Sequence, residues 1–222
     1  MMRKSWWKVL GAVMVCSSVV AGFMGPVPVL PILNETIRNI YFHVPMWFTM
    51  ITLYLISVIF SVKYLNSGER NHDIMAVEAV NVGILFCFLG LLTGMQWANI
   101  TWGDPWPNDP QLNGSAIATL MYLAYLVLRN ALEEEQKRAK ISAVYNIFAF
   151  PIMIVLIYIL PKLTDSLHPG SGGNSTFSDI DMDNNIRPVF YIAVIGWILT
   201  GIWIFTLRYR LRLVENNRNK LD

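Results

Sequence analysis

Two tryptophans and an aspartate frame a short polar segment, Trp102-Gly-Asp-Pro-Trp-Pro-Asn-Asp109, which lies between two strongly apolar stretches. Prolines within and directly after it lack a backbone donor and fix φ, so we expect a stiff loop rather than a helix or a central strand. Gly103 permits a sharp bend, and the prolines hold Trp102 and Trp106 as flat surfaces. Such surfaces either bind a flat ligand or form an aromatic belt at a membrane interface.

Two of the three histidines in the chain stand beside the ends of apolar stretches. His43 precedes Pro45 at the start of the second stretch, and His168 follows the fifth. His72 lies among polar neighbours and is interpreted as a surface residue. A single histidine at a helix end usually caps or hydrogen-bonds, but two neutral imidazoles together can fill both axial positions of a haem iron.

The same segments contain the other groups that a haem requires. Aromatic faces at Trp102 and Trp106 suit a porphyrin, and Arg38 is a cation that suits the propionates. Arg38 can also be a plain juxtamembrane cation, and Arg187, which precedes Pro188, is interpreted as a helix-entry residue.

The cysteines give no sign of covalent haem attachment. The chain has two of them, Cys16 and Cys87, both within apolar stretches, and it has no Cys-x-x-Cys-His motif. We therefore expect small core residues rather than a disulfide framework or a zinc site.

The elements that must position these residues are membrane helices. With 55% apolar and 14% charged residues among 222, the chain is too apolar for a soluble domain. Six stretches approach the ~20 residues needed to cross a ~30 Å hydrocarbon core. They are residues 6–24, 46–65, 76–98, 114–130, 143–160 and 189–207. We predict an all-α fold, one polytopic membrane domain over residues 1–222 with six transmembrane helices, of which the fourth is the least apolar.

The basic residues predict the orientation of this bundle. With six spans and a cytoplasmic N-terminus, 14 of the 17 Lys and Arg residues fall on the cytoplasmic side, and only Arg38, Lys162 and Arg187 lie outside. Both termini are then cytoplasmic, and residues 208–222 form a basic cytoplasmic tail. The long outer-face loops, 25–45, 99–113 and 161–188, contain the candidate residues.

Three further features concern packing and partners. Gly90-x-x-x-Gly94 in the third span predicts close helix contact, and Glu78 and Asn81 near its inner end are expected to hydrogen-bond across the bundle. The charge run Leu132–Lys140 is interpreted as a solvated helical extension or a docking surface for a soluble subunit. The chain has no Gly-x-x-x-x-Gly-Lys-Ser/Thr motif, so ATP-driven help would come from partner subunits.

Taken together, the motifs resemble a known family. His43-Val-Pro45 before the second span, Trp102-Gly-x-x-Trp-x-x-Asp109 after the third and Leu-His168-x-Gly-Ser after the fifth occur in that order. This order is similar to the haem exporter protein C (CcmC) type of the tryptophan-rich-loop (WWD) haem-handling membrane proteins of cytochrome c maturation. The likeness extends from about Pro26 to Leu207.

The resemblance implies a role in haem handling and delivery rather than catalysis. It implies that haem b is held without a covalent bond and passed to a periplasmic haem chaperone. It places the protein in the bacterial inner membrane with its functional loops periplasmic, together with an ABC-type ATPase and small membrane subunits, and with no nucleic acid. The matching positions are the axial ligands His43 and His168, the platform residues Trp102, Gly103, Trp106 and Asp109, and Arg38.

The sequence departs from the family pattern at several loop positions. Pro105 and Asn108 stand where aromatic residues are typical, and Gln111 stands where a basic residue is common. Asp104 adds a carboxylate that would turn the propionates toward Arg38. The third loop adds Gly170–Asn174 and the acidic run Asp179–Asp183, expected to be a mobile segment that is either solvated or faces the chaperone.

Two other functional classes stay open on the sequence. A haem b or quinone-type membrane oxidoreductase subunit also uses histidine pairs, but usually within its helices, whereas His43 and His168 lie in or beside loops. A transporter, including a haem transporter, would have broken helices and polar residues at mid-membrane. These spans are mostly uninterrupted, with Pro151 as the exception.

Overall fold

The structure, a computed structural model, describes residues 5–28, 33–168 and 184–218. Regular structure within these ranges is helical, and six helical segments are long and apolar enough to cross a membrane. The prediction of an all-α, six-span chain is therefore confirmed, including the fourth span, which is the least apolar of the six. The long helices are α1 (Trp6–Met24), α2 (His43–Ser67), α3 (Arg70–Trp102), α4 (Pro110–Asn130), α5 (Glu135–Ile154) and α7 (Ile186–Arg218).

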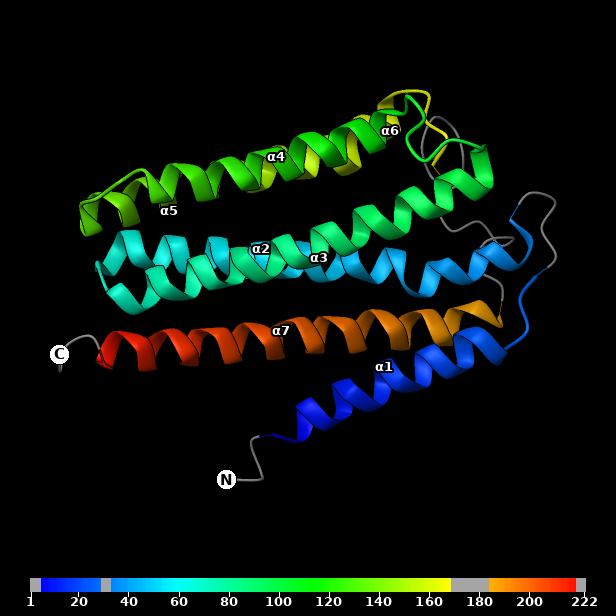
Figure 1. The fold of residues 1–222 in the computed structure, drawn as a ribbon, viewed down its shortest axis with the longest axis horizontal. Coiled ribbons are helices and arrows are strands. Elements are labelled where there is room, and N and C mark those ends of the chain that lie inside the picture. Colours follow the sequence, from blue (N-terminus) through cyan, green and yellow to red (C-terminus); the bar gives the residue numbers. More distant parts are fainter. Residues whose placement is uncertain (1–4, 29–32, 169–183, 219–222) are drawn as a thin grey trace.

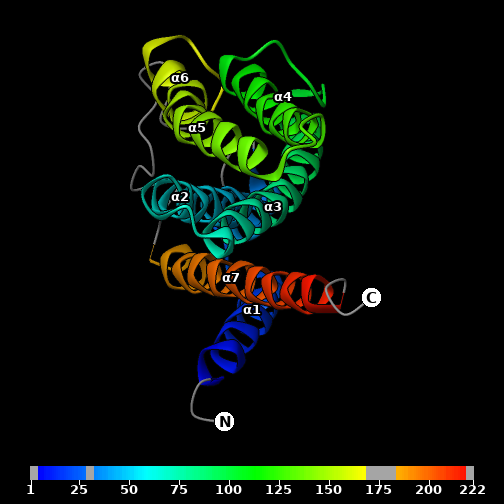
Figure 2. The ribbon, with the colours of Figure 1, turned by 90° about the vertical axis from the view of Figure 1, so that its left-hand side faces the viewer.

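The helices form three layers (Figures 1 and 2). The pair α2 and α3 lies between the pair α1 and α7 on one side and α4 with α5 on the other. The start of α1 and the end of α7 both point toward the left-hand end of the bundle in Figure 1, called here the inner end, as an even number of spans requires. The opposite end, called here the outer end, holds the end of α3, the start of α4 and the starts of α2 and α7. Segments far apart in sequence therefore meet there.

The helices extend beyond the predicted spans, and one part of the loop prediction is wrong. Trp102 does not open the loop but ends α3, which continues to that residue. The helix stops there because Gly103 adopts φ +78° and donates its N–H to the Asn99 carbonyl. Only glycine takes this conformation without a steric cost, so the expected bend at Gly103 is confirmed.

The other predicted outer loops also contain helix. A 3₁₀ segment, η2 (Asn34–Tyr41), precedes α2 and occupies much of the loop predicted over residues 25–45. A four-residue helix, α6 (Leu160–Leu163), continues into the loop predicted over residues 161–188. The expectations for Gly170–Asn174 and Asp179–Asp183 lie outside the described residues.

Ion pairs join the first part of α3 to three other helices at the inner end. Asp73 accepts two hydrogen bonds from Arg129 of α4, and Glu78, 2% exposed, accepts one at 2.7 Å from Arg208 of α7. A third pair joins Arg70 to Glu135 of α5. The prediction that Glu78 bonds across the bundle is confirmed. Asn81, by contrast, donates within α3 to Glu78 itself.

One span is irregular, and it is the one that leads to His168. Pro151 lies inside α5, and the π-helical segment η3 (Val155–Ile159) follows it. Proline removes a backbone donor from the helix, and π segments are local departures from the regular ladder. A Cβ at Gly114 of α4 would overlap the Leu156 carbonyl, so α4 approaches this segment at backbone distance.

Candidate functional site

His43, the first residue of α2, lies against the outer part of α3. Its Nδ1 is 3.0 Å from the Gly90 carbonyl oxygen and 3.2 Å from Thr93 Oγ1. A carbonyl only accepts, so Nδ1 carries the proton and Nε2 is the nitrogen with a lone pair. The indole rings of Trp47 and Trp97 meet the imidazole edge-on, with centroids 6.2 and 5.9 Å away.

The two glycines of the Gly90-x-x-x-Gly94 motif make room for this arrangement. A Cβ at Gly94 would be 2.7 Å from His43 Cε1, and a Cβ at Gly90 would be 2.9 Å from Trp47 Cε2. The predicted close contact between helices is therefore present, but rings from α2, rather than another backbone, fill the space. The motif belongs to the histidine site.

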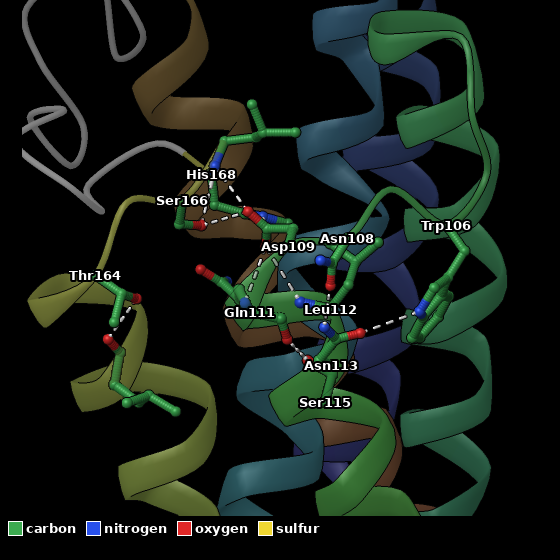
Figure 3. Close-up of polar contacts among 12 residues, drawn as sticks. Trp106, Asn108, Asp109, Gln111, Leu112, Asn113, Ser115, Thr164, Ser166 and His168 are labelled. Carbon is green, nitrogen blue, oxygen red and sulfur yellow. Dashed lines mark hydrogen bonds and ion pairs between the residues drawn. The ribbon is translucent and has the colours of Figure 1, made fainter.

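His168 is held at the outer end by Asp109, the residue that caps the start of α4 (Figure 3). Its Nδ1 is 3.1 Å from Oδ1 of Asp109, and its ring meets Trp102 edge-on with centroids 5.2 Å apart. The carboxylate accepts, so Nδ1 again carries the proton and Nε2 has the lone pair. In both His43 and His168, Nε2 is thus the ring nitrogen with a lone pair available for a ligand.

Asp109 is the central residue of this half of the site (Figure 3). It is the N-cap of α4, and its Oδ1 accepts from the Gln111 and Leu112 backbone N–H groups. Its Oδ2 accepts from Ser166 Oγ and from the Leu167 N–H, each at 2.7 Å. One carboxylate therefore joins the tryptophan loop, the start of α4 and the segment that carries His168.

Hydrogen bonding also controls the ionisation of Asp109, which is 1% exposed. Burial acts to raise the pKa of this carboxyl, but hydrogen bonds from His168, Ser166 and the Leu167 N–H outweigh it and hold the pKa well below its ordinary value. The group is consequently a carboxylate at neutral pH.

Both histidines pack against the same section of α3. His43 contacts α3 near Gly94 and His168 contacts it at Trp102. Eight residues of α-helix rise about 12 Å, so the two contacts lie within about 12 Å along one helix. His43 and His168, 125 positions apart in the sequence, thus both lie beside the outer part of α3.

The two loop tryptophans differ in their surroundings. Trp102 touches His168 directly, whereas Trp106 Nε1 donates to Asn113 Oδ1 at 3.3 Å and its backbone N–H donates to Asp104. Both rings are partly exposed. Trp106 is tied to α4 and leaves its ring at the edge of the site (Figure 3).

Arg38 lies at the outer end but has partners within the protein. Its Nη1 donates to the Gly22 and Gly25 carbonyls at 2.7 and 2.8 Å, and its Nε pairs with Glu35 at 2.6 Å. Gly22 lies in the last turn of α1 and Gly25 is its C-cap, a region where backbone acceptors lack helical donors. Arg38 therefore fixes the end of α1 beside η2.

Several residues that contact the site were not predicted from the sequence. Trp97 donates from Nε1 to Thr36 Oγ1 at 3.2 Å, and Asn39 donates to the Thr93 carbonyl at 2.9 Å. Both contacts join η2 to the outer part of α3. Trp47 follows His43 by four residues, a spacing that places two helical residues on one face and that could have indicated it.

The fold and this site define a polytopic helical membrane protein that presents two oriented histidines and a tryptophan loop at one end of its bundle. The family model described as heme exporter protein C matches residues 2–222. The chain therefore belongs to the heme exporter protein C family.

Relatives from several organisms agree with this. The chain is 26% identical to heme exporter protein C of Rhodobacter capsulatus over 199 residues, which cover 88% of the chain and 80% of the relative. It is 25% identical to that of Paracoccus denitrificans over 93% of the chain and 85% of the relative. A putative cytochrome c biosynthesis ccmC-like mitochondrial protein of Marchantia polymorpha is 27% identical over 77% of the chain and 71% of that relative.

Proposed function

We propose that this protein handles haem in cytochrome c maturation, holding haem b at the outer end of the bundle and delivering it without catalysing a reaction. Membership of the heme exporter protein C family supports the haem-handling role. The finer assignment rests on the residues of the site. His43 and His168 are the proposed axial ligands.

The observation that carries this proposal is the orientation of the two imidazoles. Each Nδ1 contacts a protein acceptor, Gly90 for His43 and Asp109 for His168, so both rings offer Nε2. Histidines that bind metals commonly donate the other ring N–H to a carbonyl or carboxylate, which fixes the tautomer. This arrangement occurs at both His43 and His168, at the outer end of the bundle.

The remaining residues supply surface and charge. Trp102, beside His168, and Trp106, at the edge of the site, offer flat faces for the porphyrin, and Gly103 sets the turn between them. Arg38 is the proposed propionate partner. Its Nε and Nη1 are bonded within the protein, so Nη2 is the group that would reach a carboxylate.

Delivery requires that the haem edge face outward. We propose that the outer end is periplasmic, that the membrane is the bacterial inner membrane, and that a periplasmic haem chaperone receives the haem. The proposed partners at the inner end are an ABC-type ATPase and small membrane subunits. The positive-inside distribution of Lys and Arg supports this orientation.

The test is the absorption spectrum of the protein purified in detergent after haem-replete expression. We expect a Soret band with low-spin bis-histidine features that is lost or converted in His43→Ala and in His168→Ala. His72→Ala is the matched control, because His72 contacts Ser67 and Glu69 in the turn between α2 and α3 at the inner end. A colourless parent, or three variants with the parent spectrum, would refute the proposal. Rapid reduction of bound haem by a quinol would instead assign the oxidoreductase class.

A further inference from the structure

The two proposed haem ligands have chemically different partners. His43 Nδ1 donates to neutral oxygens, the Gly90 carbonyl and Thr93 Oγ1. The Thr93 hydroxyl itself donates to the carbonyls of Leu89 and Gly90, so it can only accept from the imidazole. His168 Nδ1 donates to a carboxylate. An imidazole bonded to a carboxylate is the more basic ligand.

Asp109 is built to hold that contact. Besides His168 it accepts from four donors, the N–H groups of Gln111, Leu112 and Leu167 and the Ser166 hydroxyl. These bonds fix both carboxylate oxygens, so the oxygen that meets His168 has little freedom to move. The carboxylate is 1% exposed and is thus shielded from direct contact with a bound porphyrin.

We infer that Asp109 is a positioning residue that acts through His168, and that it makes His168 the stronger of two unequal axial ligands and favours ferric haem. This inference rests on the proposed function. A more basic axial ligand donates more charge to iron and stabilises its higher oxidation state. His43, with neutral partners, is then the ligand that exchanges first when haem leaves.

The experiment measures ferric haem affinity and midpoint potential for the full chain in detergent. In Asp109→Asn we expect ferric affinity to fall about 10- to 100-fold, the range for losing a partner of a metal-bound histidine. Each tenfold loss in ferric over ferrous affinity raises the potential by about 59 mV. Asp165→Asn is the control, because it removes the same charge three residues from His168, and the exposed Asp165 takes no part in the contacts of Asp109 and His168 among the described residues. We expect its affinity to stay within about threefold of the parent.

A double variant separates positioning from a general effect on the loop. If Asp109 acts through His168, Asp109→Asn costs little further affinity once His168→Ala is present, because the coupling is lost with the partner. Equal losses with and without His168 would overturn the inference, as would equal effects of Asp109→Asn and Asp165→Asn. If Asp109→Asn is not monodisperse, Asp109→Glu replaces it, since it keeps the charge but displaces the carboxylate from Nδ1. A parent protein that binds no haem refutes the proposed function instead.

Discussion

Gly94→Ala should weaken haem binding without unfolding the protein. The added Cβ would be 2.7 Å from His43 Cε1 and 3.2 Å from Nδ1, whereas carbon atoms in contact prefer about 3.5–4.0 Å. The imidazole must therefore move by about 0.8 Å. The bond from Nδ1 to the Gly90 carbonyl, now 3.0 Å, then lengthens beyond the range of a good hydrogen bond.

In Gly94→Ala we expect a loss of haem affinity but little change in protein stability. Losing the partner that orients His43 should cost about 10- to 100-fold in haem affinity, or roughly 1.4–2.8 kcal/mol. Stability should change little, because the overlap is with a ring that can rotate away. In addition, alanine is better than glycine within a helix by about 1 kcal/mol.

The assay is haem titration followed by absorption, together with a thermal melt of the same samples. Gly11→Ala is the matched control, because its Cβ would be 2.9 Å from Leu199 Cβ where α1 packs on α7. We expect Gly11→Ala to lower the melting temperature and leave haem affinity unchanged, the reverse of Gly94→Ala. Parent-like affinity in Gly94→Ala would refute the assignment of His43.

Three further results are expected. Trp102→Ala should weaken haem retention by on the order of 1–3 kcal/mol in a dissociation assay, less than loss of His168, because it removes stacking surface but no ligand. Arg129→Ala should lower the free energy of unfolding by about 3–5 kcal/mol in denaturant melts while the haem spectrum persists, because Asp73 is left buried without its charge partner. The contribution of Asp109 to stability should not change with pH above about 4. Burial raises the pKa of Asp109, but its hydrogen bonds lower the pKa by more, so the folded-state pKa lies below the ordinary value of about 3.9. The stabilisation by the Asp109 carboxylate is therefore complete above the ordinary pKa and is lost only as pH falls toward the lower folded-state pKa. Melts of the parent and Asp109→Asn between pH 3 and 7 would check this, and a parallel pH dependence of the two would contradict it.

Composition and the lengths of apolar stretches were enough to predict the number and order of the spans. A helix that crosses a bilayer must satisfy its own backbone and be apolar over about 20 residues, and both are properties of a continuous stretch of sequence. The same reasoning located Gly103 as a bend, because only a local φ preference is involved. Helix ends were less predictable, since Trp102 continues α3 where its polar neighbours indicated a loop.

The candidate site was predicted as a set of residues but not as an arrangement. His43, His168 and Trp102 stand out by residue type and by position at the ends of apolar stretches. Nothing in the sequence indicates that Arg38 fixes the end of α1, because carbonyl acceptors are present at every residue. The glycine motif of α3 was likewise recognisable, while the ring that fills it was not.

The sequence by itself thus determined an all-helical membrane chain with six apolar helices long enough to span a membrane, and it supplied the candidate residues for haem binding. Only the tertiary structure decided which partner each polar side chain has. Asp109 is the partner of His168, the Gly90 carbonyl is the partner of His43, and Arg208 is the partner of Glu78. The physical reason is that the length of an apolar stretch is a property of consecutive residues in one segment. A hydrogen bond, by contrast, depends on how separate helices are rotated and staggered against each other, and packing across the whole bundle sets that geometry.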